Sequence, residues 1–270
     1  MKPYFNICCD GNWESVYTLA FPYMEKKGVK GTAYIEVQQV DNHSEDGHMS
    51  YEQIKDLELH GWDIASHTYY HRHMDGLDGN NQPYYDDAEE NEAYIAEDLA
   101  KARSWLINHE FWRGVNFVAP PAGRWKRQWF DMYGEYCKFI RGGDTTSGYV
   151  FPSEASPIDK VQHVNYKSIG SVAYPPSVLK PIIDDVIAKG KSMNINLHII
   201  KESGATGTVQ YNLDDFKEII DYLCEKRNAG LIHLGRISDL YFNGYGNITF
   251  NRMNDTASVS IGKEVTDLTI

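Results

Sequence analysis

Residues 61–71 have the sequence GWDIASHTYYH, and this stretch decides the fold. Gly61 ends a predicted helix over residues 50–60, whose first residue, Ser50, is a good N-cap. The run that follows Gly61 has the apolar character of a short buried strand. Two histidines and two tyrosines come at the point where this strand ends. Polar side chains at the carboxyl end of a strand are typical of the active-site edge of an α/β protein.

The same order of strand and helix recurs along the chain. The predicted strands are residues 4–9, 31–37, 61–67, 116–121, 138–143 and 192–200. The predicted helices are residues 16–27, 50–60, 87–108, 124–136, 180–190 and 212–230. Apolar strands that alternate with helices indicate a parallel sheet or barrel of the α/β class. Beyond about residue 241 the pattern is that of exposed β hairpins, so we expect a barrel domain over residues 1–240 and a β-rich appendage over residues 241–270.

The composition limits the kind of partner. With 26 basic and 38 acidic residues the net charge is −12, which argues against nucleic acid because phosphate binding needs a basic surface. The 19 Tyr and 6 Trp suit stacking on sugar rings, although composition alone favours a tyrosine-rich core and surface. From the residues at the N-terminus we expect no signal peptide, and we expect no segment suited to membrane insertion. We therefore expect cytoplasmic synthesis, which is compatible with later release or assembly outside the cell.

Three polar features follow predicted strands. Asp10 follows the first strand, His67 and His71 follow the third, and His198 lies at the end of the apolar run INL. In a parallel α/β barrel these strand ends meet on one face. A carboxylate and two imidazoles are suitable ligands for Zn²⁺, and equally for Co²⁺, Mn²⁺ or Ni²⁺. Each residue taken alone is as well explained by an ordinary turn or a hydrogen-bonded loop, so the prediction of a metal site depends on their joint occurrence.

These features resemble the motifs of the polysaccharide deacetylases with the NodB-homology domain, carbohydrate esterase family 4. The family motif TFDDG aligns with residues 7–11, H-S/T-x-x-H with residues 67–71, and RPPYG with residues 119–123. The family's late strand end with a histidine aligns with Leu197 and His198. The resemblance covers about residues 4–240, and HTYYH is its most specific part.

The resemblance implies a distorted (β/α) barrel that removes N- or O-linked acetyl groups from a polysaccharide or cell-surface glycan with the help of a divalent metal. Asp10, His67 and His71 would then hold the metal. His198 would be the general acid, and the backbone N–H of Ala122 would stabilise the oxyanion. The expected partner is an acetylated glycan, and the oligomeric state stays open.

Two positions depart from the family pattern. The aspartate that serves as the general base falls on Cys9, and the arginine that orients it falls on Ala119. One interpretation is a catalytically degenerate carbohydrate-binding relative, with a place in a phage or surface assembly. The other is that the base function has moved, with the Cys9 thiol as a candidate base and Arg141 as the replacement positive charge. A small buried hydrophobic role for Cys9 and a surface salt bridge for Arg141 are the simpler alternatives.

Aromatic residues near the predicted site are candidates for substrate contacts. We expect Pro121, Trp125 and Tyr70 to contact the glycan, with Trp125 the strongest candidate for stacking on a sugar ring. Packing in the core or in loops is the alternative for at least half of the aromatic candidates, which also include Trp13, Tyr69 and Tyr174. Asp144, in the loop GGDTTSG, is a candidate substitute carboxylate, or else an ordinary turn residue.

Overall fold

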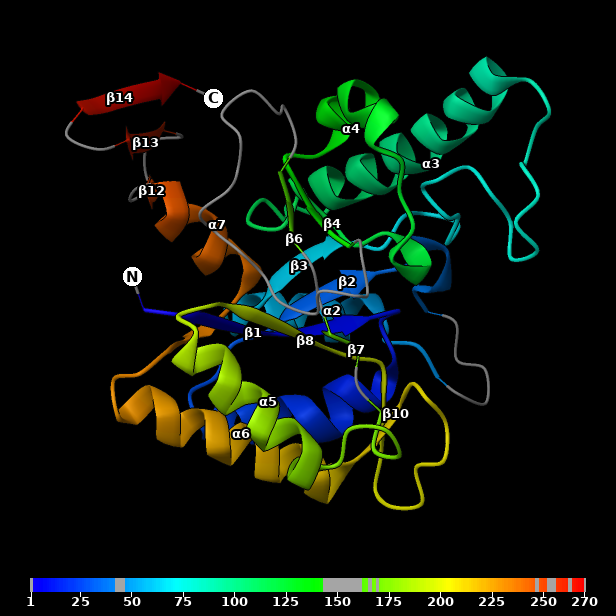
Figure 1. Cartoon of the computed structure of the whole chain (residues 1–270). Coiled ribbons are helices and arrows are strands. Elements are labelled where there is room, and N and C mark those ends of the chain that lie inside the picture. The colour runs from blue at the N-terminus through cyan, green and yellow to red at the C-terminus, as the bar shows by residue number, and fades with distance from the viewer. Residues whose placement is uncertain are drawn as a thin grey trace.

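A curled parallel sheet forms the centre of the molecule, with helices packed against its outer side (Figure 1). The computed structural model describes residues 2–41, 47–142, 162–164, 167–168, 170–245, 248–251, 256–261 and 264–269. Within these residues nine strands pair in the order β6-β5-β4-β3-β2-β1-β8-β7, and β11 pairs with β1 beside that path. All of these pairings are parallel. The predicted distorted (β/α) barrel of the α/β class is confirmed.

The bounds of the elements follow chain order. The strands of the main sheet are β1 (Tyr4–Asp10), β2 (Thr32–Ile35), β3 (Asp63–Ser66), β4 (Phe117–Val118), β5 (Phe139–Arg141), β6 (Gln162–Val164), β7 (Lys167–Ser168), β8 (Met193–Leu197) and β11 (His233–Gly235). The α-helices are α1 (Phe21–Lys26), α2 (Tyr51–Leu59), α3 (Ala88–Asn108), α4 (Phe130–Tyr136), α5 (Pro176–Ala188), α6 (Leu213–Asn228) and α7 (Ile237–Tyr245). Two short strands, β9 (Ile199–Lys201) and β10 (Gln210–Asn212), pair separately.

Local signals set several of these ends. Ser50 and Gln53 form a reciprocal capping box at the start of α2, and Asp87 accepts hydrogen bonds from the first turn of α3. The predicted helix over residues 16–27 is instead a π-helical turn, Val16–Ala20, followed by α1. The predicted strand over residues 192–200 is interrupted at His198, which lies between β8 and β9.

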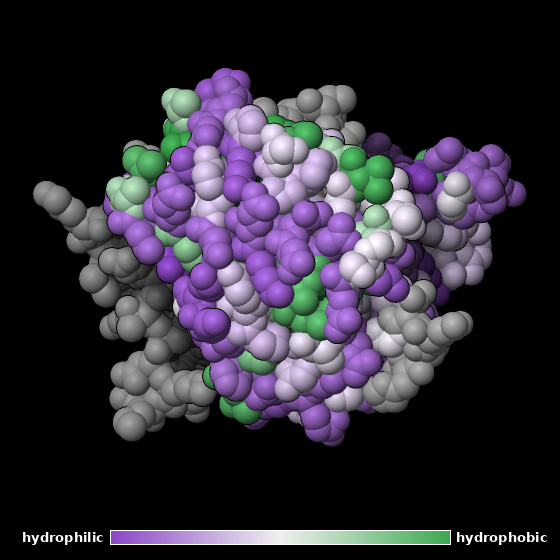
Figure 2. Space-filling view, turned by 90° about the horizontal axis from the view of Figure 1, so that it is seen from below, coloured by the Kyte–Doolittle hydropathy of each residue, from purple (hydrophilic) through white to green (hydrophobic). Residues whose placement is uncertain are grey.

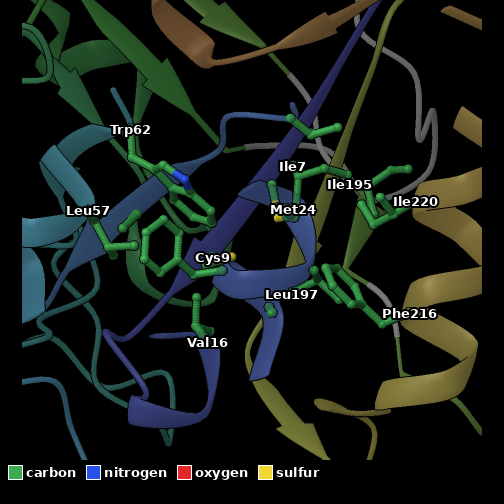
Figure 3. Packing of buried hydrophobic residues seen from close by; sticks show 14 of the residues in the cluster. Ile7, Cys9, Val16, Met24, Leu57, Trp62, Ile195, Leu197, Phe216 and Ile220 are labelled. Atoms are coloured by element: carbon green, nitrogen blue, oxygen red, sulfur yellow. The ribbon is translucent and has the colours of Figure 1, made fainter. Parts of the chain in front are cut away.

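The side chains of β1 divide between two layers, because successive residues of a strand point to opposite faces. Tyr4 and Cys8 pack inside the barrel, in a cluster that also contains Tyr34, Phe117 and Phe139. Ile7 and Cys9 pack on the outer side among hydrophobic residues of the sheet and the helices (Figure 3). Asp10 has the same parity as Cys8, and its side chain therefore lies inside the barrel.

β1 is also the strand with the most neighbours in the sheet. It pairs with β8 along one edge, from Phe5 to Cys9. Its other edge is shared: β11 pairs with the first half, from Tyr4 to Asn6, and β2 with the second half, from Cys8 to Asp10. The site at the end of β1 is therefore held by strands from the beginning and from the end of the chain.

The lower face in Figure 1, formed by α5 and α6, is mostly hydrophilic (Figure 2). Ion pairs link the two helices there, between Lys180 and Glu218 at 2.6 Å and between Lys226 and Asp184 at 2.8 Å. In the part of this face that the structure describes, hydrophobic atoms appear only in small separate areas. Among the described residues, no helix has both the length and the apolar character needed to cross a membrane.

The last described elements are three antiparallel strands, as the pattern of residues 241–270 predicts. They are β12 (Ile248–Asn251), β13 (Thr256–Ile261) and β14 (Glu264–Thr269). Helix α7 begins before residue 240 and ends after it, so it crosses the predicted boundary between barrel and appendage. The division into two domains stays a prediction.

Candidate active site

The carboxylate of Asp10 lies inside the barrel and is bound by two side chains from other strands. Arg141 Nη2, from β5, donates to Oδ1 at 2.7 Å and to Oδ2 at 2.5 Å. Asn196 Nδ2, from β8, donates to Oδ2 at 2.9 Å. The guanidinium of Arg141 also lies over the ring of Tyr34, 4.8 Å from its centroid. Asp10 is 4% exposed, and Arg141 and Asn196 are fully buried, so this ion pair is shielded from water.

His67 and His71 follow β3 and face each other, with ring centroids 4.9 Å apart. His67 Nδ1 lies 2.8 Å from the carbonyl oxygen of Ala119, at the end of β4. Because a carbonyl can only accept, Nδ1 carries the proton and Nε2 keeps its lone pair. This is the arrangement in which a histidine is prepared to bind an ion or accept a proton through Nε2.

His198 completes the group of ionisable side chains at this end of the barrel. His198 directly follows β8, the strand that pairs with β1, and Asp10, Arg141 and His71 influence its pKa, so it lies at the same end of the barrel. Nδ1 of His198 is buried and has no hydrogen-bond partner among the described residues. The strand ends therefore place Asp10, His67, His71, His198 and Arg141 at the same end of the barrel, and their catalytic roles stay predictions.

The charges at neutral pH follow from burial and from Arg141. Burial acts to raise the pKa of the Asp10 carboxyl. The guanidinium of Arg141, together with smaller contributions from His67 and His198, nevertheless holds that pKa below its ordinary value. Burial lowers the pKa of His67 to about 3, against the attraction of Asp10. Burial also lowers the pKa of His71 and of His198. Near pH 7 the site therefore holds one carboxylate, one guanidinium and three neutral imidazoles.

Two of the three predicted metal ligands fit a divalent cation, and the third does not. The neutral imidazoles of His67 and His71 are suitable donors. Both oxygens of Asp10, however, already accept hydrogen bonds, and the donor that binds both of them is itself a cation. Within the described residues, no three His, Cys, Asp or Glu side chains are placed to hold one ion. The predicted set of Asp10, His67 and His71 is thus not assembled as a ligand set, because Arg141 occupies the carboxylate.

Asp98, on α3, holds the loop that carries the two histidines, and the sequence analysis missed it. Its Oδ1 accepts from the backbone nitrogens of Tyr69 at 2.7 Å and Tyr70 at 2.8 Å. The loop needs such support because Thr68 and His71 adopt positive φ angles of 67° and 59°. The available signal was an acidic residue at helical spacing from the apolar residues Ile95 and Ala102, although nothing in this spacing connects it to the loop.

Asn196 was also missed, and here a sequence signal existed. Asn194, Asn196 and His198 alternate with apolar residues along β8 and just beyond it. The period of two places all three on one face, which is the inside of the barrel. The side-chain amides of Asn6 and Asn194 are hydrogen-bonded to each other there, and Asn196 donates to Asp10. Polar residues at every second position of a buried strand indicate a polar interior.

Cys9 does not lie with the other predicted catalytic residues. Its thiol is 1% exposed and packs on the outer side of the sheet, near Val16, Met24 and Leu57 (Figure 3). Burial raises its pKa well above the ordinary value, so the thiol is protonated at neutral pH. A buried, protonated thiol in an apolar layer does not meet the requirements of a general base, and we leave Cys9 out of the proposed catalytic set. The simpler alternative, a small buried hydrophobic residue, describes its surroundings.

The third motif forms a tight turn at the end of β4. Pro121 is buried, Ala122 is exposed with φ 54°, and the turn is closed by hydrogen bonds from the amides of Gly123 and Arg124. The amide of Ala122 is not used to close it. Trp125 follows with its indole ring stacked on Phe130, at a centroid distance of 4.9 Å. Phe130 therefore covers one face of the Trp125 ring, which we expect from the sequence to stack on a sugar.

Tyr70 is engaged by cations. Lys101 Nζ donates to its hydroxyl at 2.8 Å, and the guanidinium carbon of Arg72 lies 4.4 Å from the ring centroid. These contacts leave less of the ring for a sugar than the sequence predicts. Trp13, another candidate, stacks on His48 at 4.5 Å. Asp144, the candidate substitute carboxylate, lies outside the described residues.

Comparisons with known proteins agree with this fold. Residues 2–135 match the family model described as polysaccharide deacetylase. No curated protein matches the chain. Solved structures share the fold at low sequence identity, which by itself supports the fold alone.

Three solved structures illustrate that likeness. BA3943 from Bacillus anthracis, a pseudoenzyme of carbohydrate esterase family 4, is 14% identical with a TM-score of 0.53, over 88% of this chain and 65% of that one. A variant of the peptidoglycan deacetylase PdaC from Bacillus subtilis is 14% identical with a TM-score of 0.52, over 89% and 90%. The Xyl-CE4 domain of a xylanase from the hindgut metagenome of Trinervitermes trinervoides is 13% identical with a TM-score of 0.51, over 91% and 93%. The match over residues 2–135, on a barrel of this fold, identifies the chain as a divergent member of the polysaccharide deacetylase family with the NodB-homology domain.

Proposed function

We propose that the chain hydrolyses N- or O-linked acetyl groups of a polysaccharide or cell-surface glycan. The observation that carries the proposal is the placement of Asp10, His67, His71 and His198 at the carboxyl ends of neighbouring barrel strands. Family membership supports a deacetylase type of reaction. An acidic chain of net charge −12 also suits a neutral glycan better than a polyanion.

The predicted metal ligands do not all suit a divalent ion equally well. Deacetylases of this family are generally metal-dependent, and Zn²⁺, Co²⁺, Mn²⁺ or Ni²⁺ would suit the two imidazoles of His67 and His71. The carboxylate does not fit such an ion while Arg141 binds it. The proposed steps of acetyl hydrolysis therefore use only the chain's own residues.

His198 is the proposed proton-transfer residue. Since burial keeps its imidazole neutral, it first accepts a proton from the water whose oxygen attacks the acetyl carbonyl carbon. The carboxylate of Asp10 stabilises the imidazolium that forms, through the attraction that already opposes the lowering of the His198 pKa. The imidazolium then donates this proton to the leaving nitrogen or oxygen as the bond from carbon to that atom breaks. The products are acetate and a free amine or hydroxyl on the sugar.

The tetrahedral intermediate carries a negative oxygen, which needs a hydrogen-bond donor. The backbone N–H of Ala122 is the candidate, because it belongs to an exposed turn that it does not help to close. The positive φ of Ala122 fixes the orientation of that turn. Loss of a single such donor lowers kcat by about 10²–10³ in other hydrolases.

Release of acetate tests the proposal. Purified protein, with and without added Zn²⁺ or Co²⁺, is incubated with chitooligosaccharides, acetylxylan and a bacterial surface glycan, and acetate is measured enzymatically. We expect release from at least one substrate and a loss of about 10²–10⁴-fold in His198→Gln. His109→Gln, at the end of α3, is the matched control and keeps full activity. No acetate from any substrate contradicts the proposal.

A second candidate is a carbohydrate-binding relative without turnover. The occupied carboxylate of Asp10 favours it, since three hydrogen bonds leave that group a weak base. The pseudoenzyme BA3943, with which the chain shares its fold, exists in a variant with restored activity. Calorimetry with the same glycans separates the two candidates. A binder gives a measurable Kd that is unchanged in His198→Gln and releases no acetate.

A further inference from the structure

The positive charge next to Asp10 is the guanidinium of Arg141. Arg141 Nη2 bridges both carboxylate oxygens, at 2.7 and 2.5 Å, and Asn196 supplies a further donor to Oδ2. A metal ion would need a lone pair of one of these oxygens at about 2.0–2.2 Å. The guanidinium stays charged at every pH at which the protein is folded. Oδ1 accepts a single hydrogen bond and keeps a further lone pair, so the obstacle to a divalent ion at this carboxylate is the like charge of Arg141, which bridges both oxygens.

Arg141 is fixed in this place. It is fully buried, its strand β5 lies between β4 and β6 in the sheet, and Tyr34 from β2 lies against the guanidinium plane at 4.8 Å. A buried guanidinium cannot turn out into solvent as a surface arginine does. Release of Asp10 would thus require movement within the barrel core, where packing resists it.

The other two predicted ligands, His67 and His71, could both bind an ion through a ring nitrogen. His67 has its Nδ1 proton directed to the Ala119 carbonyl, so that Nε2 is left as a donor, and His71 lies beside it. His67 is buried, and His71 lies beside it at the exposed end of the barrel. Removal of the guanidinium would leave a carboxylate and two imidazoles without an opposing cation, which is the set that divalent metals prefer.

We propose that Arg141 is a built-in substitute for the divalent cation, so that the ion pair with Asp10 and metal binding at Asp10, His67 and His71 exclude each other. The wild-type site binds Zn²⁺ or Co²⁺ weakly, through its imidazoles alone. Loss of the guanidinium restores a three-ligand site. This property concerns metal affinity and does not depend on whether the site turns over an acetylated glycan.

Metal titration of the full chain tests the proposal. Zn²⁺ binding is measured by calorimetry, and Co²⁺ binding by its visible absorption spectrum, for the wild type and for Arg141→Met. We expect the Kd of Arg141→Met to be at least about tenfold lower. Arg141→Lys keeps the charge and should keep the weak affinity. The double variant Arg141→Met with Asp10→Asn should lose the gain, because it lacks the carboxylate ligand.

Asp10→Asn alone keeps the test decisive if Arg141→Met fails to fold. Asparagine has nearly the same shape, and Asp10 is not a ligand in the wild type under the proposal. Its Kd for Zn²⁺ should therefore equal that of the wild type. The proposal is overturned if Asp10→Asn weakens metal binding tenfold or more, or if Arg141→Met binds metal no more tightly than the wild type. Acetate release is not part of either readout, so the outcome is independent of the proposed function.

Discussion

Oδ1 of Asp98 lies 2.7 Å from the backbone nitrogen of Tyr69, and this contact joins α3 to the loop between the two site histidines. The same oxygen accepts from Tyr70, and Oδ2 lies 3.4 Å from the nitrogen of Arg72. Asp98 touches no reacting group, so it acts as a positioning residue. It offsets the strain of a loop in which two residues that are not glycine have positive φ.

Asp98→Ala should therefore loosen the loop and lower kcat by at least about tenfold, in line with the effect of losing a residue that orients an active-site side chain. Hydrogen exchange at the Tyr69 and Tyr70 amides should become faster. Asp98→Asn keeps one acceptor oxygen and should restore most of the protection. Glu89→Ala, an exposed residue in the first turn of the same helix, is the control and should change neither readout. Unchanged amide exchange in Asp98→Ala would contradict the positioning role.

Cys9→Asp should destabilise the protein without creating a base. The new carboxylate would lie in an apolar layer without a partner, so we expect the free energy of unfolding to fall by about 3 kcal/mol or more. Cys9→Ala removes only the sulfur and should lower it by about 1 kcal/mol. Urea denaturation measures both. A stable Cys9→Asp protein with increased acetate release would show that this position faces the site after all.

The stability of the fold should depend on pH through Asp63. This carboxylate, at the amino end of β3, is fully buried between Arg113 and the amide of Ser238. Burial, against the attraction of nearby arginines, raises its pKa from 3.8 to about 6. Because the folded pKa is the higher one, the protonated form stabilises the fold. That contribution is complete below about pH 4 and is lost as the pH rises through about 6.

Asp63→Asn cannot ionise and should lack this dependence. Relative to the variant, the wild type should lose about 3 kcal/mol of unfolding free energy between pH 4 and pH 7, since one pKa unit is about 1.4 kcal/mol. Urea denaturation at several pH values gives the two curves. Asp214→Asn, an exposed carboxylate at the start of α6, is the control and should follow the wild type. Parallel curves for wild type and Asp63→Asn would exclude a raised pKa.

Gly114→Ala should be strongly destabilising, because its Cβ would lie 1.8 Å from the carbonyl oxygen of Ile64 in β3. The obstacle is backbone, so no side-chain rotation relieves it, and we expect a loss of about 1–3 kcal/mol or more. At Gly79 an added Cβ meets no atom within 4 Å, so Gly79→Ala should be neutral or slightly stabilising. Thermal unfolding compares the two. A similar Tm for both variants would mean that the segment before β4 can move away from β3.

The sequence predicts the helices and strands around the site well, because the signals that begin and end these elements are local. Periodicity, the Ser50 and Asp87 caps and the glycine stops locate most helices and strands within a few residues. The place of Asp10 and His67 at strand ends follows from the parallel architecture alone. The orientation of Cys9 was also within reach, since adjacent residues of a strand face opposite ways and Asp10 faces inward.

What the sequence could not supply was the pairing across the barrel. Arg141 and Asn196 meet Asp10 from positions 131 and 186 residues away, and neither distance follows from any periodicity. Which strand end faces which depends on the curvature of the sheet. The occupied carboxylate, the feature that most changes the expected chemistry, is therefore visible only in three dimensions.

Strand β1 pairs with other strands along both of its edges, and this affects how the protein folds during synthesis. The neighbours of β1 in β8 and β11 leave the ribosome nearly two hundred residues or more after Asp10. At about 5–20 residues per second, β1 waits on the order of ten seconds or longer before both its edges can be paired. During that interval an apolar strand with open edges is exposed to other nascent chains. Slow assembly of β1, and protection by chaperones until it is complete, should therefore govern the yield of folded protein.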